Sequence, residues 1–212
     1  IVWQRKSICA IYSKLFVKVK NRLKDVLNEK ILYTDGLRPD EISARIRLCN
    51  NVKGFFENDL TKQDRQTDKP IIDVEMAMYD ILGVHTDVIR SWREMHETWR
   101  FKSKNYWGQG ESMRLTGQAT TAIGNCLTNM QVHQSFVKKN FYNLKLALFL
   151  GDDMCMLFDA TPNIKSLRKD IATKFNMQSK DNWCNNGATF CSMVLCKLPN
   201  DRAELAADVV RL

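Results

Sequence analysis

Two apolar runs joined by a short acidic turn constrain the fold more than any other feature of this sequence. The runs Leu144–Leu150 and Met154–Phe158 flank the tripeptide Gly151-Asp152-Asp153. Short apolar runs on either side of a glycine-containing turn are typical of a buried β-hairpin. The sequence therefore predicts a hairpin whose tip carries two adjacent carboxylates.

The acidic tip points to a bound cation. Adjacent carboxylates repel each other, and the apolar strands keep them close to a region of low dielectric constant. Mg²⁺ would compensate this charge, since it prefers one or two carboxylates together with substrate phosphates. A lone Gly-Asp-Asp is also an ordinary solvated turn, because both residue types favour turns. The interpretation therefore needs support from other segments.

A second acidic segment follows an aromatic, β-prone run. Residues 52–60 are predicted to form a strand that ends near Asp59, and Asp64 lies where the chain turns toward a helix. Taken alone, this spacing is explained by a helix N-cap. A strand ending in Asp59 beside a hairpin tipped by Asp152 and Asp153 can hold two cations at one edge of a sheet. Two-metal phosphoryl and nucleotidyl transfer needs that arrangement.

A glycine-led loop enters a helix between the two acidic segments. The helix predicted over residues 117–136 carries Thr121 and Asn125 four residues apart, and therefore on one face. Polar side chains at these positions can hydrogen-bond a ribose hydroxyl. Considered alone, the segment is better explained by a loop that caps a helix with incidental polar residues.

Helical periodicity and turn residues account for most of the remaining chain. Apolar residues recur three and four apart in several segments, as on one face of an amphipathic helix. Together with the hairpin, this pattern predicts an α+β fold. Helices are predicted over residues 8–29, 40–48 (capped by Asp40), 71–82, 87–99, 164–175 and 201–212, a loop or short hairpin over residues 102–114, and a further strand over residues 188–198.

The basic composition favours a nucleic-acid partner. The chain has 212 residues, of which 32 are Lys or Arg and 24 are Asp or Glu, for a net charge of +8. Such a surface attracts phosphate backbones, although a merely basic soluble domain has the same composition. No apolar run is long enough to span a membrane. The chain begins at Ile1 rather than Met, so we expect it to be part of a longer protein.

The seven cysteines include no CxxC pair. Reduced, buried thiols are the simplest interpretation. A zinc site built from Cys184, Cys191, Cys196 and a histidine is the alternative. Bound zinc without Mg²⁺-dependent activity would favour that alternative.

Taken in order, these segments resemble the signature motifs of RNA-dependent RNA polymerases from positive-strand RNA viruses, most closely those of the alphavirus-like supergroup. The resemblance runs from near residue 4 to near residue 198, and the ordered set is more specific than any single motif. Asp59–Asp64 resembles motif A, Thr116–Asn125 motif B, Gly151–Asp153 motif C, Ala172–Lys180 motif D, Phe190–Ser192 motif E and Gln4–Ile8 the tail of motif F.

Two positions depart from the family pattern. Thr116 stands where serine is common before the motif B glycine, and it keeps the hydroxyl while adding a methyl group. We therefore expect function to survive this change. Gln63 stands where many relatives have Phe or Tyr, which is expected to shift the local packing.

The resemblance implies a set of catalytic residues. Asp59 and Asp152 would be the main ligands of two Mg²⁺ or Mn²⁺ ions, with Asp153 assisting them. Lys180 would act as the general acid that protonates the pyrophosphate leaving group. A solvated surface lysine explains Lys180 equally well.

The resemblance also implies nucleotide-binding residues. Asp64 and Asn125 would sense the ribose 2′-hydroxyl, with Thr121 supporting them, and Gly117 would lead the loop. Discrimination through a bonded hydroxyl is strong, because an analogue without it leaves buried polar groups unpaired. Arg5 and Lys6 would contact the triphosphate, although solvated side chains explain them equally well.

The fold that the resemblance implies is a polymerase palm, an antiparallel sheet backed by helices, with partial fingers. Most of the thumb and much of the fingers do not fit in 212 residues, so activity is assigned to the parent protein. The implied division is fingers over residues 1–50, palm with motif A over 51–84, a fingers insertion over 85–115, palm with motifs B to E over 116–200, and the start of the thumb over 201–212.

The implied function is template-directed RNA synthesis. An RNA 3′-hydroxyl would attack the α-phosphate of a nucleoside triphosphate and release pyrophosphate. The expected partners are RNA template and product, nucleoside triphosphates and other domains of a viral replicase polyprotein. The expected location is the host cytoplasm, in membrane-associated replication complexes.

Two further alternatives remain open. A reverse transcriptase shares the palm, but Gly151, Asp64 and Asn125 favour ribonucleotides, and nucleotide preference would decide. A catalytically inactive RNA-binding module is the other alternative, although clustered acids without metal would weaken RNA binding. Tyr106 and Trp107, with Phe101, could either stack on bases or pack within the fingers.

Overall fold

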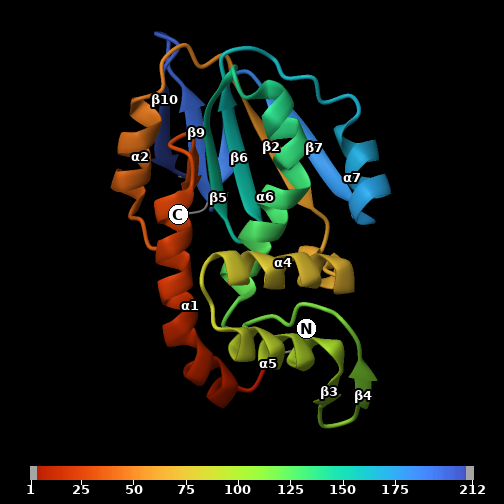
Figure 1. The fold of residues 1–212 in the computed structure, drawn as a ribbon. Coiled ribbons are helices and arrows are strands. Elements are labelled where there is room, and N and C mark those ends of the chain that lie inside the picture. Colours follow the sequence, from red (N-terminus) through yellow and green to blue (C-terminus); the bar gives the residue numbers. More distant parts are fainter. Residues whose placement is uncertain (1–3, 209–212) are drawn as a thin grey trace. The chain divides into compact units, whose positions relative to one another are not determined.

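The computed structural model describes residues 4–208, and residues 1–3 and 209–212 lie outside the described part (Figure 1). The chain divides into two compact units. We call Ile1–Val26 with Lys62–Thr128 the helical unit, and Leu27–Thr61 with Asn129–Leu212 the sheet unit. The domain boundaries predicted from the sequence stay predictions.

Aromatic packing forms the centre of the helical unit. The ring of Phe16 packs 5.1 Å from those of both Tyr79 and Trp92, centroid to centroid. All three side chains are buried, each on a different helix. The elements of this unit are α1 (Lys6–Val26), α3 (Gln63–Gln66), α4 (Lys69–Ile81), α5 (Thr86–Glu97), β3 (Trp99–Lys102), β4 (Trp107–Gly110) and the first part of α6 (Thr121–Asn140).

Local capping explains where α4 begins. The carboxylate of Asp68 accepts a hydrogen bond from the Ile71 backbone N–H at 3.3 Å, and Pro70 stands in the first turn, where its missing N–H costs nothing. The structure confirms the helices predicted over residues 8–29, 71–82 and 87–99, with ends shifted by a few residues.

The sheet unit is built on a five-stranded sheet in the order β1-β5-β6-β2-β7. Its strands pair antiparallel except β1 with β5. A three-stranded sheet has the order β10-β9-β8. The elements of this unit are β1 (Ile31–Tyr33), α2 (Pro39–Arg47), β2 (Gly54–Leu60), β5 (Leu144–Leu150), β6 (Asp153–Phe158), α7 (Leu167–Phe175), β7 (Ser179–Cys184), β8 (Gly187–Phe190), β9 (Met193–Lys197), β10 (Ala203–Ala207) and the rest of α6.

Both faces of the five-stranded sheet are covered, which explains why its central strands are continuous apolar runs. On one face, Phe136 of α6 packs against Phe56 and Phe158, with ring centroids 4.8 and 6.0 Å away. Figure 1 shows α6 lying over β2 and β6. On the other face, Phe55 and Leu157 join a core with residues of α2 and the smaller sheet. The α+β fold and the central hairpin are confirmed.

Three predicted elements differ from the structure. The strand predicted over residues 188–198 is two strands, because Cys191 and Ser192 both adopt positive φ and turn the chain. The helix predicted over residues 201–212 is wrong for Ala203–Ala207, which pairs with β9, while residues 209–212 lie outside the described part. The helix predicted from Asp40 begins at Pro39, with Arg38 as its N-cap.

No helix in the described part is long and apolar enough to cross a membrane. The cysteines are all free, and Cys49, Cys126 and Cys155 are buried. Buried free cysteines behave as small apolar side chains, which agrees with the simplest interpretation of the sequence.

Candidate active site

The acidic tip lies on the β5–β6 hairpin. Leu150 pairs with Asp153, so Gly151 and Asp152 form a two-residue loop. Gly151 has φ of +59° whereas Asp152 keeps a negative φ, a pattern that matches a type II′ turn with glycine at its first position. The turn leaves Asp152 exposed at the end of two buried strands.

Asp153 is partly buried beside the turn of the β8–β9 hairpin. Its carboxylate accepts a hydrogen bond from the Cys191 backbone N–H at 2.6 Å. Burial raises the pKa of Asp153 above its ordinary value and the charge of Asp152 adds to the rise, while the Cys191 hydrogen bond opposes it. The tip therefore places one partly buried carboxylate, Asp153, beside the exposed carboxylate of Asp152.

Strand register brings Asp59 to the same end of the sheet. Paired positions on β2 and β6 run from Gly54 and Phe158 to Glu57 and Cys155. Two residues farther along each strand stand Asp59 and Asp153. Since side chains alternate between faces, this spacing puts both carboxylates on the same face.

Lys180 lies on the other neighbour of β2. Asp59 and Lys180 are paired positions of the antiparallel β2–β7 ladder, and both side chains are exposed. Directly opposite residues have their Cβ atoms about 5 Å apart. The predicted metal ligand and the predicted general acid are therefore cross-strand neighbours.

The carboxylates at this sheet end fit a hard divalent cation. Mg²⁺ takes oxygen ligands and usually keeps several waters, so that one or two carboxylates suffice. Asp59, Asp152 and Asp153 supply oxygens of that kind. Within residues 4–208, no group of three or more His, Cys, Asp or Glu side chains gathers as a metal site, and this holds for the three aspartates as well as for the cysteines of the zinc alternative.

The helical unit assembles a separate polar group around Asp64. Asn125 Nδ2 donates to Asp64 Oδ1 at 2.7 Å, and Thr116 Oγ1 donates to Asp64 Oδ2 at 3.1 Å. Buried Gln63 donates from Nε2 to the Asn125 carbonyl at 2.8 Å. Both oxygens of the Asp64 carboxylate are thus held by the segment predicted to contact ribose.

The other predicted nucleotide-binding residues have different surroundings. Thr121 Oγ1 donates to the Leu115 carbonyl at 3.1 Å, so it supports the loop. Gly117 is exposed with φ of +73°, a backbone conformation that favours glycine. Arg5 and Lys6 are exposed near the start of α1.

Sequence reasoning missed a buried ion pair beneath this loop. Arg114 is 1% exposed and Glu75 is 2% exposed, and their side chains form an ion pair to which Tyr79 adds a 2.6 Å hydrogen bond. Burial alone would raise the pKa of Glu75, but the charge and hydrogen bonds of Arg114 outweigh it and hold that pKa below its ordinary value. A Cβ at Gly124 would collide with the Arg114 guanidinium. Two features of the sequence could have indicated the ion pair: the charged Glu75 within the helix predicted over residues 71–82, and Gly124 within the helix predicted over residues 117–136.

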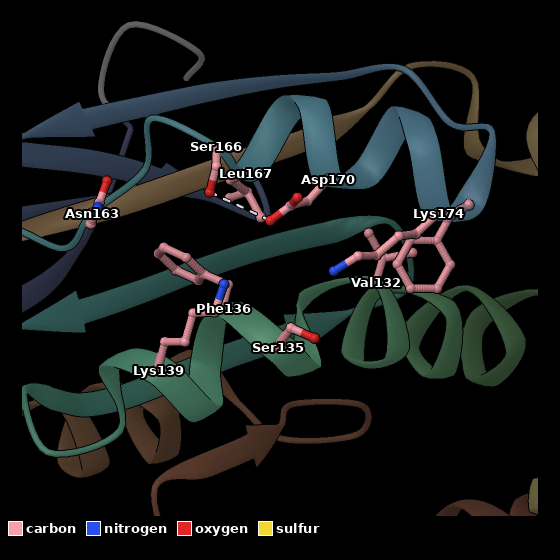
Figure 2. Close-up of a pocket in the computed structure, with 10 residues that line it drawn as sticks. Val132, Ser135, Phe136, Lys139, Asn163, Ser166, Leu167, Asp170 and Lys174 are labelled. Carbon is pink, nitrogen blue, oxygen red and sulfur yellow. Dashed lines mark hydrogen bonds between the residues drawn. The ribbon is translucent and has the colours of Figure 1, made fainter.

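A small pocket lies between α6 and α7 (Figure 2). Figure 2 shows Phe136 and Lys139 on one side and Asp170 and Lys174 on the other, with Ser166 hydrogen-bonded to Asp170. None of the predicted site residues lines this pocket. It is therefore a feature distinct from the acidic tip.

Known proteins share this sequence pattern. A relative in Beet yellows virus, replicase polyprotein 1ab, is 24% identical and covers 85% of this chain. The RNA-directed RNA polymerase 2a of Tobacco streak virus is 25% identical over 92% of the chain, and the RNA replication protein of Chrysanthemum virus B is 25% identical over 84%. The chain spans 6%, 24% and 65% of these three proteins, respectively.

Solved structures share the fold. The RNA-dependent RNA polymerase of a human picobirnavirus matches 82% of this chain with a TM-score of 0.64 and 11% sequence identity, and the match covers 36% of that polymerase. An insertion-loop deletion mutant of such an enzyme matches 84% of the chain with a TM-score of 0.63 and 12% identity, and the match covers 38% of it.

The family assignment rests on the whole chain. The model of the family described as RNA dependent RNA polymerase matches residues 1–212. The relatives confirm the resemblance to polymerases of positive-strand, alphavirus-like viruses. This chain belongs to the RNA-dependent RNA polymerase family.

Proposed function

We propose that this chain is the catalytic segment of an RNA-directed RNA polymerase that joins nucleotides with the help of two divalent metal ions. The observation that carries the proposal is the strand register that brings Asp59 and Asp153 to one sheet end, beside the exposed Asp152. Bound there, the metal ions would stabilise the attacking and leaving oxygens of the phosphoryl group.

The reaction joins the oxygen of an RNA 3′-hydroxyl to the α-phosphorus of a nucleoside triphosphate, and the hydroxyl proton leaves to water. The bond from that phosphorus to the bridging oxygen breaks, and pyrophosphate leaves. Asp59 and Asp152 would hold the metal ions, which would supply positive charge to the phosphoryl group, and Asp153 would support them from its bond to Cys191. Lys180, opposite Asp59, donates a proton to the departing pyrophosphate.

Selection of ribonucleotides falls to the Asp64 group. The Asp64 carboxylate is partly exposed and is fixed by Asn125 Nδ2 at 2.7 Å, so it is the acceptor of this group that a nucleotide can reach. A ribose 2′-hydroxyl can donate to Asp64, and a deoxynucleotide forgoes that hydrogen bond. This arrangement favours an RNA polymerase over a reverse transcriptase.

RNA is the proposed template and product. The net charge of +8 favours phosphate backbones. On the β3–β4 hairpin, Trp107 is 86% exposed and pairs across the ladder with Lys102, and Arg100 pairs with Gln109 on the same face. Exposed aromatic rings among cations are suited to stacking bases while gripping phosphates.

We place the parent protein in a viral replicase. Relatives are named as replicase or replication polyproteins, which supports other replicase domains as partners. Location in membrane-associated complexes of the host cytoplasm is part of the same proposal.

The proposal is tested by primer extension with the full-length parent protein. Asp152→Asn should lower nucleotide incorporation by about a hundredfold or more, since metal-ion catalysis contributes several kcal/mol to the transition state. Asp87→Asn, an exposed carboxylate on α5, is the control and should keep wild-type incorporation. Equal incorporation by all three proteins would support the inactive RNA-binding alternative instead.

A further inference from the structure

The carbonyl group at the acidic tip has an unusual partner. Asn129 of α6 is fully buried, at 0% exposure, and its Nδ2 donates to the Gly151 carbonyl oxygen at 3.1 Å. Both residues belong to the sheet unit. The Asn129 side chain on α6 thus forms a hydrogen bond with the backbone of the loop that joins β5 and β6.

The orientation of the Gly151–Asp152 peptide determines which type of turn forms. Types I′ and II′ share a positive φ at the first loop residue and differ in the orientation of the peptide that joins the two loop residues. In type I′ the second residue also takes a positive φ, which aspartate tolerates better than most residues. The Gly151–Asp152 peptide could therefore rotate, and rotation would turn the Gly151 carbonyl away from Asn129.

Packing alone does not explain an asparagine at position 129, because a buried apolar side chain would be more stable there. The Asn129 Oδ1 is buried without a hydrogen-bond partner, which destabilises the fold relative to an apolar side chain of similar size. Its backbone carbonyl accepts a 2.8 Å hydrogen bond from His133 Nδ1 within α6. The side chain therefore has one described polar task, which is to hold the Gly151 carbonyl.

We infer that Asn129 is a positioning residue that fixes the Gly151–Asp152 peptide and thereby aims the Asp152 carboxylate. The inference rests on the proposed function, in which Asp152 holds a metal ion. Residues that orient metal ligands typically change metal affinity ten- to a hundredfold when they are altered. Without Asn129, the turn samples both peptide orientations, and only one of them presents Asp152 correctly.

The experiment measures Mn²⁺ affinity of the full-length parent protein by isothermal titration calorimetry. Asn129→Leu keeps the volume and removes the donor, and Asn129→Ser is a smaller side chain that cannot reach the carbonyl. Thr128→Val is the matched control, because Thr128 is buried one residue earlier on α6 and its hydroxyl has no partner. Both Asn129 variants should bind Mn²⁺ about tenfold more weakly, and Thr128→Val should bind as wild type.

Primer extension separates the possible failures. With Asn129→Leu, half-maximal incorporation should need about tenfold more Mg²⁺, while KM for the nucleotide at saturating Mg²⁺ stays unchanged. If wild type binds metal but Asn129 variants bind it equally well, the inference is overturned and the proposed function stands. If wild type neither binds metal nor incorporates nucleotides, the proposed function itself fails. Loss of folding in both variants would assign Asn129 to the helix core and also overturn the inference.

Discussion

At the scale of single residues, hydroxyl and amide groups carry the proposed selectivity. Asp64 receives one hydrogen bond at each carboxylate oxygen, from Asn125 and from Thr116. The threonine at the position where serine is common keeps this contact, because the hydroxyl is shared by both residues. Gln63 stands where an aromatic residue is common, and its buried side chain donates a hydrogen bond to the Asn125 carbonyl. The glutamine therefore adds a hydrogen bond between the motif A segment and the motif B helix.

The Thr116 hydroxyl predicts a matched pair of variants. Thr116→Val removes the donor at nearly constant volume, and the discrimination between ribo- and deoxynucleotides should fall about tenfold, since one hydrogen bond to a charged group contributes about 1.5 kcal/mol or more. Thr116→Ser should keep wild-type discrimination. The measurement is the ratio of kcat/KM for an NTP and its dNTP, and an equal ratio in both variants would remove Thr116 from the nucleotide-binding group.

His133 predicts a pH dependence of folding. Burial lowers the pKa of His133 to about 4, while Nδ1 donates to the Asn129 carbonyl. The unfolded chain, with an ordinary histidine pKa of about 6.5, binds the proton more readily. This contribution to stability is therefore complete above about pH 6.5 and falls by about 1.4 kcal/mol per pH unit as the pH drops toward 4.

The His133 contribution can be isolated with one variant. The free energy of unfolding of wild type and His133→Gln should be measured by urea denaturation between pH 7 and 4.5. Burial also lowers the pKa of His96, so some acid sensitivity should remain in the variant. An identical slope in the two proteins would show that His133 is not held neutral in the folded state.

At the scale of elements, the pairing register of the β3–β4 hairpin gives its two faces different side chains. Trp99 and Phe101 lie over Gly110 and Gly108 on one face, where a Cβ at either glycine would collide with a ring. The opposite face keeps Trp107 exposed beside Lys102. Phe101 thus packs within the hairpin, whereas Trp107 is available to a base.

The exposed face predicts an RNA contact. Trp107→Ala should weaken binding of single-stranded RNA to the parent protein by about fivefold to a hundredfold, since stacking contributes about 1–3 kcal/mol per base. Tyr142→Ala is the control, because Tyr142 is 93% exposed and lies on a different segment. Fluorescence anisotropy at fixed salt gives the dissociation constants. Equal effects of both substitutions would mean that the hairpin is not an RNA contact.

The sequence predicts elements well where their signal is local. The β5–β6 hairpin has apolar runs and a glycine that the type II′ turn requires. The β8–β9 turn uses Cys191 and Ser192 at positive φ, so it lacks the usual glycine or asparagine signal. Strand β10 contains alanine, glutamate and leucine, which favour helix, and pairing with β9 overrides that preference.

The site shows the same division. The positions of Asp59, Asp152 and Asp153 could be predicted because each stands at or next to the end of a strand that the sequence also reveals, while their role as metal ligands stays a prediction. The ion pair of Arg114 with Glu75 joins residues 39 apart in the chain, and no local pattern links them. The bond from Asn129 to Gly151 likewise depends on how a helix packs on a hairpin.

At the scale of the whole molecule, the chain is two units that the polypeptide crosses more than once. The acidic tip and Lys180 belong to the sheet unit, and the Asp64 group belongs to the helical unit. The central claim concerns the sheet unit, where residues nearly a hundred apart in sequence meet through β2 and β6.

A double-mutant cycle on metal affinity tests that claim most directly. Mn²⁺ binding should be measured by calorimetry for the wild-type parent protein, Asp59→Asn, Asp152→Asn and the double variant. Each single substitution should weaken binding, and the double variant should lose clearly less than the sum of the two, because residues that share a site are not additive. Fully additive losses, or an affinity unchanged by either single substitution, would contradict a shared metal site at this end of the sheet.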